Sequence, residues 1–398
     1  MLNIKDKSQC CGCNSCASRC PKQCITLQED FEGFRYPTIN TSLCINCGIC
    51  EKVCPTINHK EGKKPLQALA FVNPNESIRL QSSSGGAFTF IAEQIISEGG
   101  VVFGAIFDNK WEVCHTFTET KEGLAAFRGS KYVQSRIESA YRNAECFLKA
   151  GRKVLFSGSP CQIAGLKLYL RKEYDNLTTV DFICHGVPSP KVWRKYLEEN
   201  YSKHKTKKEI VDSSLNGIST ITGISFRDKT LTGWKKYNFI IQGKSTCDSN
   251  KNSILSSTIF YDNLYMQAFL QNLILRPSCY ACPSKKGQSN SDITLADFWG
   301  VEKFLPSLND DKGVSLLLAN SEKGLQIIKI FLSFAPQVNF EAILPYNSSW
   351  SDSAIPHRKR EFFFKGLKKG KRISSNIRES LHPTFIQKIK FKIYKLSI

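Results

Sequence analysis

The chain has 398 residues, of which 41% are hydrophobic and 23% charged, a composition typical of a globular protein rather than a disordered or fibrous one. Its formal net charge is +20, and it contains 17 cysteines. The sequence starts without the apolar stretch of a signal peptide and has no run of about eighteen apolar residues, which argues against secretion and a transmembrane helix. We therefore expect a cytoplasmic protein, whose thiols stay reduced and available as metal ligands.

One cysteine pattern, C-x2-C-x2-C-x3-C-P, occurs twice near the start of the chain, as in bacterial two-cluster ferredoxins. Three thiolates within one tight loop can hold three corners of a cubane, whereas the fourth points away and serves the other cluster. The pattern therefore predicts two [4Fe-4S] clusters, one on Cys10, Cys13, Cys16 and Cys54, and one on Cys44, Cys47, Cys50 and Cys20.

Zinc and disulfides are the alternatives for these cysteines. Zinc sites favour two separated pairs of ligands, often with histidine, rather than three cysteines in seven residues repeated twice. Gly12 and Gly48 lie inside the loops, where the backbone must pass close to inorganic sulfide. Cys11 and Cys24 fall outside the pattern, and we interpret them as packing residues near the clusters.

Beyond a polar linker at residues 56–65, strand and helix patterns alternate. We expect strands at 68–73, 101–107, 154–156, 179–183, 293–298 and 314–318, and helices at 87–98, 162–171, 191–200, 261–275 and 323–334. Between residues 221 and 242 the pattern becomes alternating and predicts an antiparallel pair at 224–227 and 234–242. The predicted fold class is an α+β ferredoxin-like module followed by a mainly parallel α/β domain with an antiparallel insertion.

Two loops that follow predicted strands each present a cysteine, Cys161 and Cys184. Because parallel strands end at the same edge of a sheet, these thiols should lie near one another. Cys279 and Cys282 form a further C-x2-C pair. These four cysteines are candidate ligands of a third [4Fe-4S] cluster, although zinc or a redox dithiol would use the same spacing.

Two further segments are candidate anion sites. Residues 82–86, Ser-Ser-Ser-Gly-Gly, precede a predicted helix, where serine caps the helix and glycine admits a close phosphate. Arg128, Lys131 and Tyr132 cluster in a polar loop, for which a solvated surface is the alternative. Neither segment identifies a ligand by itself.

Six segments make the chain recognisable, namely SSSGGAFT, FRGSKYVQS, LFSGSPCQIAGLK, VDFICHGVPSPKVW, LRPSCYAC and SDITLADFWG. In this order behind a two-cluster ferredoxin segment, they closely resemble the beta-subunit family of coenzyme F420 hydrogenases and dehydrogenases, over residues 3–324. That family binds FAD and iron–sulfur clusters and moves electrons between them and a second carrier. The chain is most similar to the bacterial members whose substrate is unassigned.

The resemblance implies a flavin at the strand ends described above. Its candidate lining residues are Ser83, Ser84, Gly85, Gly86, Lys131, Tyr132, Gln134, Ser157 and Gly158. The resemblance also favours the third cluster on Cys161, Cys184, Cys279 and Cys282. His185 and Asp297 are the candidates for proton delivery, since a flavin-dependent reduction needs protons. A histidine bonded only to backbone is the alternative for His185.

With the family in view, four regions are expected. They are a two-cluster ferredoxin-type domain at 1–58, a family N-terminal region at 66–150, a family C-terminal flavin and iron–sulfur domain at 151–345, and a basic tail at 346–398. The tail carries thirteen Lys and Arg against two Glu between Arg358 and Lys395. We interpret it as a solvated or partner-binding arm; contact with an anionic membrane surface is an alternative, and nucleic acid is not expected because no reading motif accompanies the charge.

The function expected from these observations is that of a flavin-dependent iron–sulfur oxidoreductase. A one-electron carrier protein such as ferredoxin would exchange electrons with the N-terminal clusters, and the flavin would serve a small-molecule substrate or a deazaflavin-type carrier. One alternative is an electron-transfer subunit without a substrate of its own, which serves a partner enzyme. Another is a zinc-binding interaction protein.

Overall fold

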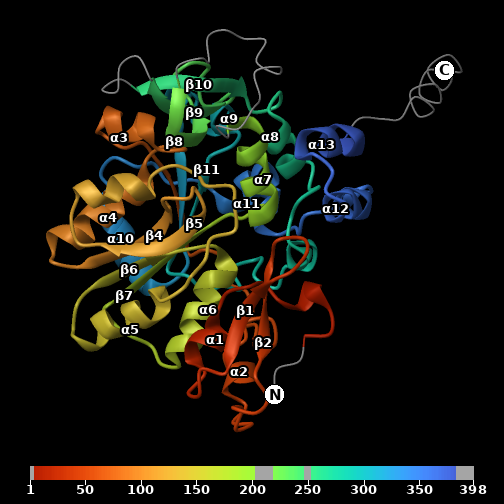
Figure 1. Ribbon diagram of the computed structural model, residues 1–398. Coiled ribbons are helices and arrows are strands. Elements are labelled where there is room, and N and C mark those ends of the chain that lie inside the picture. Colours follow the sequence, from red (N-terminus) through yellow and green to blue (C-terminus); the bar gives the residue numbers. More distant parts are fainter. Residues whose placement is uncertain (1–3, 202–217, 246–251, 382–398) are drawn as a thin grey trace, which may run out of the picture.

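A seven-stranded sheet forms the centre of the computed structural model, which describes residues 4–201, 218–245 and 252–381 (Figure 1). The strand order is β3-β12-β11-β7-β6-β4-β5. The bounds of these strands are Gln67–Phe71 (β3), Val101–Phe107 (β4), Val113–Thr118 (β5), Val154–Ser157 (β6), Leu177–Phe182 (β7), Ile293–Asp297 (β11) and Ser315–Ala319 (β12).

The large sheet is mixed, so the prediction of a mainly parallel sheet is wrong. Strands β11, β7, β6 and β4 run parallel to one another in its centre. On one side β4 and β5 form an antiparallel hairpin, and on the other β11, β12 and β3 pair antiparallel. The short link between β4 and β5 permits only an antiparallel return, because a parallel pair needs a long crossover.

Helices cover both faces of the sheet, because alternate residues of its buried strands are apolar on each side. Leu69 and Phe71 of β3 belong to the core under α4 (Ala87–Ser97) and α10 (Glu322–Ile328), whereas Ala68 and Ala70 belong to a core on the opposite face. That opposite face is covered farther along by α5 (Ala140–Lys149) and α6 (Pro160–Leu170). The remaining α-helices of the α/β part are α3 (Glu76–Gln81), α7 (Pro190–Tyr201), α9 (Val301–Phe304) and α11 (Phe340–Ile343).

The antiparallel insertion is a separate three-stranded sheet, β10-β9-β8. Its strands are Ile218–Asp228 (β8), Asn238–Ser245 (β9) and Asn252–Ile259 (β10), of which the sequence predicted the first two. Helix α8 follows but covers only Leu264–Leu270, because Asn272 adopts a left-handed conformation that ends the helical run predicted as far as residue 275.

The N-terminal segment is a small unit at the opposite end of the molecule from the three-stranded sheet, beside α6 (Figure 1). It comprises α1 (Ser15–Arg19), α2 (Ile49–Lys52) and the hairpin of β1 (Ile25–Glu29) and β2 (Arg35–Ile39). Short 3-10 helices complete the fold at Lys7–Gln9 (η1), Glu122–Phe127 (η2), Pro277–Ala281 (η4), Pro306–Leu308 (η5), Lys329–Phe331 (η6) and Leu344–Trp350 (η7).

Part of the segment predicted as a basic tail is folded against the core. Helices α12 (Arg360–Lys368) and α13 (Ile373–Leu381) bury Phe363, Ile373 and Ile377 in the core beneath the insertion. The amphipathic pattern predicted at 385–398 lies outside the described residues. Within the described ranges, no helix has the length and apolar character needed to cross a membrane.

Candidate functional site

The first predicted set of cluster ligands comes together beside helix α1. Burial raises the pKa of the Cys16 thiol well above its usual value, and the neighbouring thiols of Cys13, Cys10 and Cys54 raise it further. Burial likewise raises the pKa of Cys10, and Cys13 and Cys54 again act in the same direction. The left-handed backbone of Gly12, with φ +71°, turns the loop between these ligands. The structure thus groups the four thiols that the motif assigns to one cluster.

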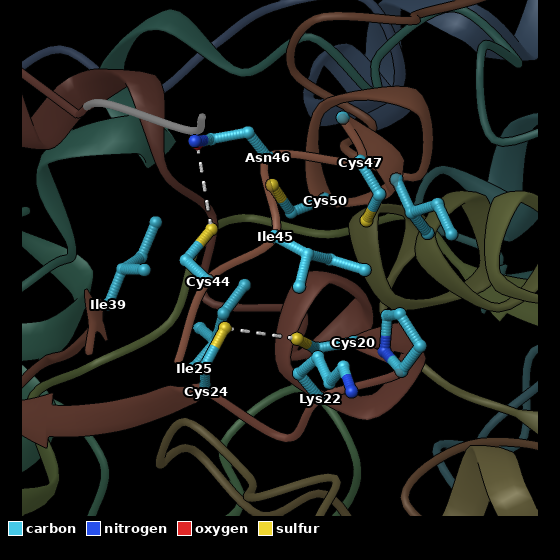
Figure 2. A pocket seen from close by; sticks show the side chains of 13 residues that line it. Cys20, Lys22, Cys24, Ile25, Ile39, Cys44, Ile45, Asn46, Cys47 and Cys50 are labelled. Carbon is cyan, nitrogen blue, oxygen red and sulfur yellow. Dashed lines mark hydrogen bonds between the residues drawn. The ribbon is translucent and has the colours of Figure 1, made fainter. Parts of the chain in front are cut away.

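The second predicted set surrounds a hollow that is open to solvent (Figure 2). Cys20, Cys44, Cys47 and Cys50 all line it, together with Cys24. Cys24 Sγ lies 3.4 Å from Cys20 Sγ, and its interpretation as a packing residue stays a prediction. Cys50 is buried whereas Cys47 is exposed, so this set reaches the molecular surface.

The third predicted set also comes together, although its members are far apart in sequence. Cys161 lies in the first turn of α6, Cys184 follows β7, and Cys279 and Cys282 lie in and directly after η4. Burial raises the pKa of Cys184 well above its usual value; Lys285 opposes this effect, and Cys279, Cys161 and Cys282 reinforce it. Burial is also the main cause that raises the pKa of Cys279 and of Cys282, and the Cys161 thiol raises both further.

Cys11 connects the first and third sets. Only 7% of its surface is exposed. Hydrogen bonds with Cys13, and to a smaller extent with Cys161, raise the pKa of its thiol. The contact between α1 and α6 brings the sets together, because Ser15 donates a 2.8 Å hydrogen bond to the Gly165 carbonyl. A side chain at Gly165 would meet Cys13, which explains why glycine is required in α6 at this point. Thiols therefore continue from the N-terminal unit into the α/β part.

The residues of all three sets fit [4Fe-4S] clusters. Each set offers four sulfur donors, and those of the first and third sets are largely shielded from water. Each ligand of a cubane binds a different iron, so the ligands stand farther apart than those of a single ion. Among the described residues, no three His, Cys, Asp or Glu side chains are grouped closely enough for a single ion.

The serine-glycine loop is held against the edge of the sheet where β11 ends. Ser84 Oγ donates to the Val314 carbonyl at 2.7 Å, and Ser83 Oγ accepts from the Ser130 amide at 2.7 Å. A Cβ at Gly85 would lie 2.2 Å from the Phe71 carbonyl oxygen, so only glycine allows this approach. Gly86, with φ +83°, then starts α4. These contacts with neighbouring segments fix the position of the loop.

The other predicted flavin residues have separate partners, and one of them lies away from this edge. Lys131 Nζ donates to the carbonyl oxygens of Phe127, Arg128 and Gly129, and burial lowers its pKa to about 7. Ser157 donates to the Phe103 carbonyl, and the amide of Gly158 donates to the Val180 carbonyl. The ring of Tyr132 stacks on that of Phe269. Gln134 faces the first cysteine set, because its amide donates to the Cys11 carbonyl at 3.0 Å.

Arg227 of β8 is a site residue that sequence reasoning missed. Its side chain is 5% exposed and pairs through Nη1 with Asp297. Its Nε and Nη2 groups have no hydrogen-bond partner within the described part of the chain. Lys229, whose pKa burial lowers to about 7, donates to the Ser84 carbonyl from the same strand end. Buried donors without partners fit an anionic group, such as the phosphates of a dinucleotide cofactor.

The two predicted proton-delivery residues have separate partners. His185 Nε2 lies 2.6 Å from Asn272 Oδ1, and burial lowers the pKa of its imidazole. Asp297 accepts from Arg227 and, at 3.1 Å, from Trp234 Nε1. The backbone-bonded alternative for His185 is therefore wrong, since a side-chain amide holds the ring. The roles of both residues in proton delivery stay predictions.

Comparison with known proteins identifies two regions. Residues 9–58 match the family described as 4Fe-4S dicluster domain. Residues 151–333 match the family that is described as the C terminus of the coenzyme F420 hydrogenase/dehydrogenase beta subunit. The chain therefore carries a C-terminal domain of the F420 hydrogenase/dehydrogenase beta-subunit type behind a 4Fe-4S dicluster domain.

Two relatives in the F420 group are similar over nearly the same share of the chain. The coenzyme F420-dependent sulfite reductase of Methanocaldococcus jannaschii is 27% identical over 171 residues, which are 41% of this chain and 26% of that protein. An F(420)H(2) dehydrogenase subunit from Methanosarcina mazei is 24% identical over 169 residues, 40% of this chain and 48% of that protein. The chain thus spans less than half the length of these curated relatives.

A solved structure also aligns with the chain. It is that of the F420-reducing [NiFe] hydrogenase complex from Methanosarcina barkeri, with a TM-score of 0.44 and 16% sequence identity. The alignment covers 79% of this chain and 91% of the solved chain.

Proposed function

We propose that this beta-type chain is an iron–sulfur flavoprotein that transfers electrons between a one-electron carrier protein and a two-electron acceptor. The observation that carries this proposal is the continuous arrangement of its thiols. They begin at the exposed Cys47, pass through the first set, and continue by way of Cys11 to Cys184 at the end of a central strand. Such an order suits electrons that enter at the surface and move toward the sheet edge.

The flavin is proposed for the edge formed by the ends of β3, β6 and β11. There the serine-glycine loop and Lys131 lie near the sheet, and Arg227 carries two buried donors without partners among the described residues. When bound, a flavin accepts single electrons from clusters and delivers them in pairs to an organic acceptor. Arg227, Lys131 and the loop amides would bind its anionic part.

His185 is proposed to supply protons on the cluster side of this region. It follows Cys184 directly, and its ring is fixed by the bond with Asn272 and by edge contact with Phe269 at 5.2 Å between ring centroids. A depressed pKa leaves the imidazole neutral near pH 7, so that it can accept a proton and return it. Asp297 would instead fix Arg227, because its carboxylate already accepts from that guanidinium.

A deazaflavin is the acceptor that we propose to test first, because the names of both relatives contain coenzyme F420 or its reduced form. An electron-transfer subunit that serves a partner enzyme is a second candidate, favoured by the name of the Methanosarcina mazei relative, which describes one subunit of a dehydrogenase. Affinity purification of the tagged chain under anaerobic conditions distinguishes the two. A stable partner without deazaflavin turnover by the isolated chain would favour the electron-transfer role.

The direct test is the content of iron, sulfide and flavin per chain after anaerobic purification, with electron paramagnetic resonance of the reduced protein. We expect about twelve iron atoms and one flavin. Cys279→Ala should lower the iron content by about four atoms and leave the signals of the other two clusters. Arg227→Gln should lower flavin content, whereas Arg194→Gln, at a half-buried ion pair with Glu29, should not. About eight iron atoms and no flavin would refute the proposal.

A further inference from the structure

Arg276 is a fully buried cation beside the first cysteine set, with 0% of its surface exposed. Its Nε donates to the Cys10 carbonyl at 2.7 Å, and its Nη2 lies 3.6 Å from Cys10 Sγ. Nη2 also donates to the Arg35 carbonyl at 2.9 Å. The aromatic ring of Tyr36 lies against the guanidinium, 4.3 Å from Cζ to the ring centroid. The guanidinium is therefore held in one orientation and shielded from water.

No carboxylate in the described ranges pairs with Arg276; its contacts are carbonyls, the Gln134 amide oxygen, a thiol and aromatic rings. An unpaired buried charge is costly, and buried charges in proteins are normally compensated. The available compensation is the negative charge of a cluster on four thiolates, whose ligand Cys10 is in direct contact. A cluster bound there would therefore form a charge pair with Arg276 through Cys10.

The loops around Arg276 are built to admit it. A Cβ at Gly12 would lie 2.9 Å from Arg276 Nη1, so the guanidinium fits against the ligand loop only because residue 12 is glycine. Gln134 fixes both sides of this contact: its Oε1 accepts from Arg276 at 3.0 Å, while its Nε2 donates to the Cys11 carbonyl. Gln134 therefore acts here as a positioning residue.

Arg276 also belongs to the loop that carries the third set. It directly precedes η4, and its carbonyl accepts from the Cys279 amide at 2.9 Å. One side chain thus extends from the loop of the third set to a ligand of the first set, across the interface where Cys11 lies. By contrast, the cation that lines the hollow of the second set is Lys22, which is exposed, so that solvent screens its charge; no buried cation is among the described residues of that lining.

We propose that Arg276 raises the reduction potential of the cluster on Cys10, Cys13, Cys16 and Cys54, and so draws electrons from the surface cluster toward the third. Reduction adds one negative charge to a cluster, and a fixed neighbouring cation stabilises the reduced form. The donor is the proposed one-electron carrier. The inference rests on the cluster content under the proposed function, but not on the flavin.

The test is a redox titration followed by electron paramagnetic resonance of the anaerobically purified, cluster-loaded protein. Signals are assigned with Cys16→Ser and Cys50→Ser variants. In Arg276→Gln, we expect the reduction equilibrium of the first cluster to shift at least tenfold toward the oxidised form, about 59 mV for a one-electron couple. Arg276→Lys, which keeps the charge, should keep most of the reduction potential of the unmodified protein. The second cluster serves as an internal control. Arg194→Gln is a control for weaker attachment of the N-terminal unit, because Arg194 pairs with Glu29 of β1.

An unchanged potential in loaded Arg276→Gln would overturn the proposal, as would equal shifts in the first and second clusters. If Arg276→Gln loses the first cluster, the titration of the unmodified protein is the test. In that protein the first cluster must have a higher reduction potential than the second, and the reverse order overturns the proposal. The flavin content and the third cluster are measured separately. Their absence would contradict the proposed function without altering the outcome for Arg276.

Discussion

Replacing Glu32 by glutamine should weaken the attachment of the N-terminal unit to the rest of the chain. Glu32 accepts from both terminal nitrogens of Arg360 in α12, at 3.0 and 2.5 Å. The Glu32 and Arg360 side chains are only 9% and 16% exposed. Removal of one member of a fully buried pair costs about 3–5 kcal/mol, because the other charge is left without compensation. Arg360 keeps its bond to the Leu275 carbonyl, so we expect about 3 kcal/mol.

Urea unfolding of the loaded protein, followed by tryptophan fluorescence, measures this change in the free energy of unfolding. The matched control is Glu379→Gln, which breaks an ion pair with Lys371 whose side chains are 48% and 41% exposed. Exposed pairs contribute about 0–1 kcal/mol, so the control should be nearly neutral. Equal losses in the two variants would refute the argument that burial decides the effect.

Three further outcomes are expected. Cys24→Ala should keep its full iron content, whereas Cys44→Ala should lose about four iron atoms by chemical analysis, because only the latter is a predicted ligand. Burial lowers the pKa of His115 to about 4. The neutral ring therefore contributes about 3 kcal/mol to the free energy of unfolding above pH 6.5, and this contribution is lost as the pH falls toward 4. In urea titrations at several pH values, His115→Gln should flatten this part of the dependence of stability on pH. Gly85→Ala should lower the melting temperature and flavin content, whereas Gly99→Ala, with no atom near its added methyl group, should retain its flavin.

The grouping of the N-terminal cysteines could be predicted because each triplet occupies one short loop, where spacing along the chain fixes spacing in space. The central strands were predictable for a similar reason, since a strand such as Val101–Phe107 is a continuous apolar run. Strand β5, which reads Val-Cys-His-Thr-Phe-Thr, is too polar for that signal. Without it, the antiparallel hairpin of β4 and β5 could not be foreseen.

The positions of Arg276 and Arg227 could not be read from the sequence. Arg276 contacts Cys10 across 266 positions, and Arg227 meets Asp297 across 70. Their environments exist only after the fold has formed, because nothing in their local sequence distinguishes them from solvated arginines. Helices α12 and α13 were missed since the positive charges around Phe363 and Ile377 obscured an apolar face.

The pair formed by Glu32 and Arg360 has a consequence for biosynthesis. The partners are 328 positions apart, and a ribosome that adds about 5–20 residues per second needs on the order of tens of seconds to travel from one to the other. For most of that interval all eight predicted N-terminal cysteine ligands have been made, but α12 does not yet exist to hold their unit in place. Factors that insert clusters would therefore have a period of access to the nascent cysteine loops before α12 forms and pairs with Glu32.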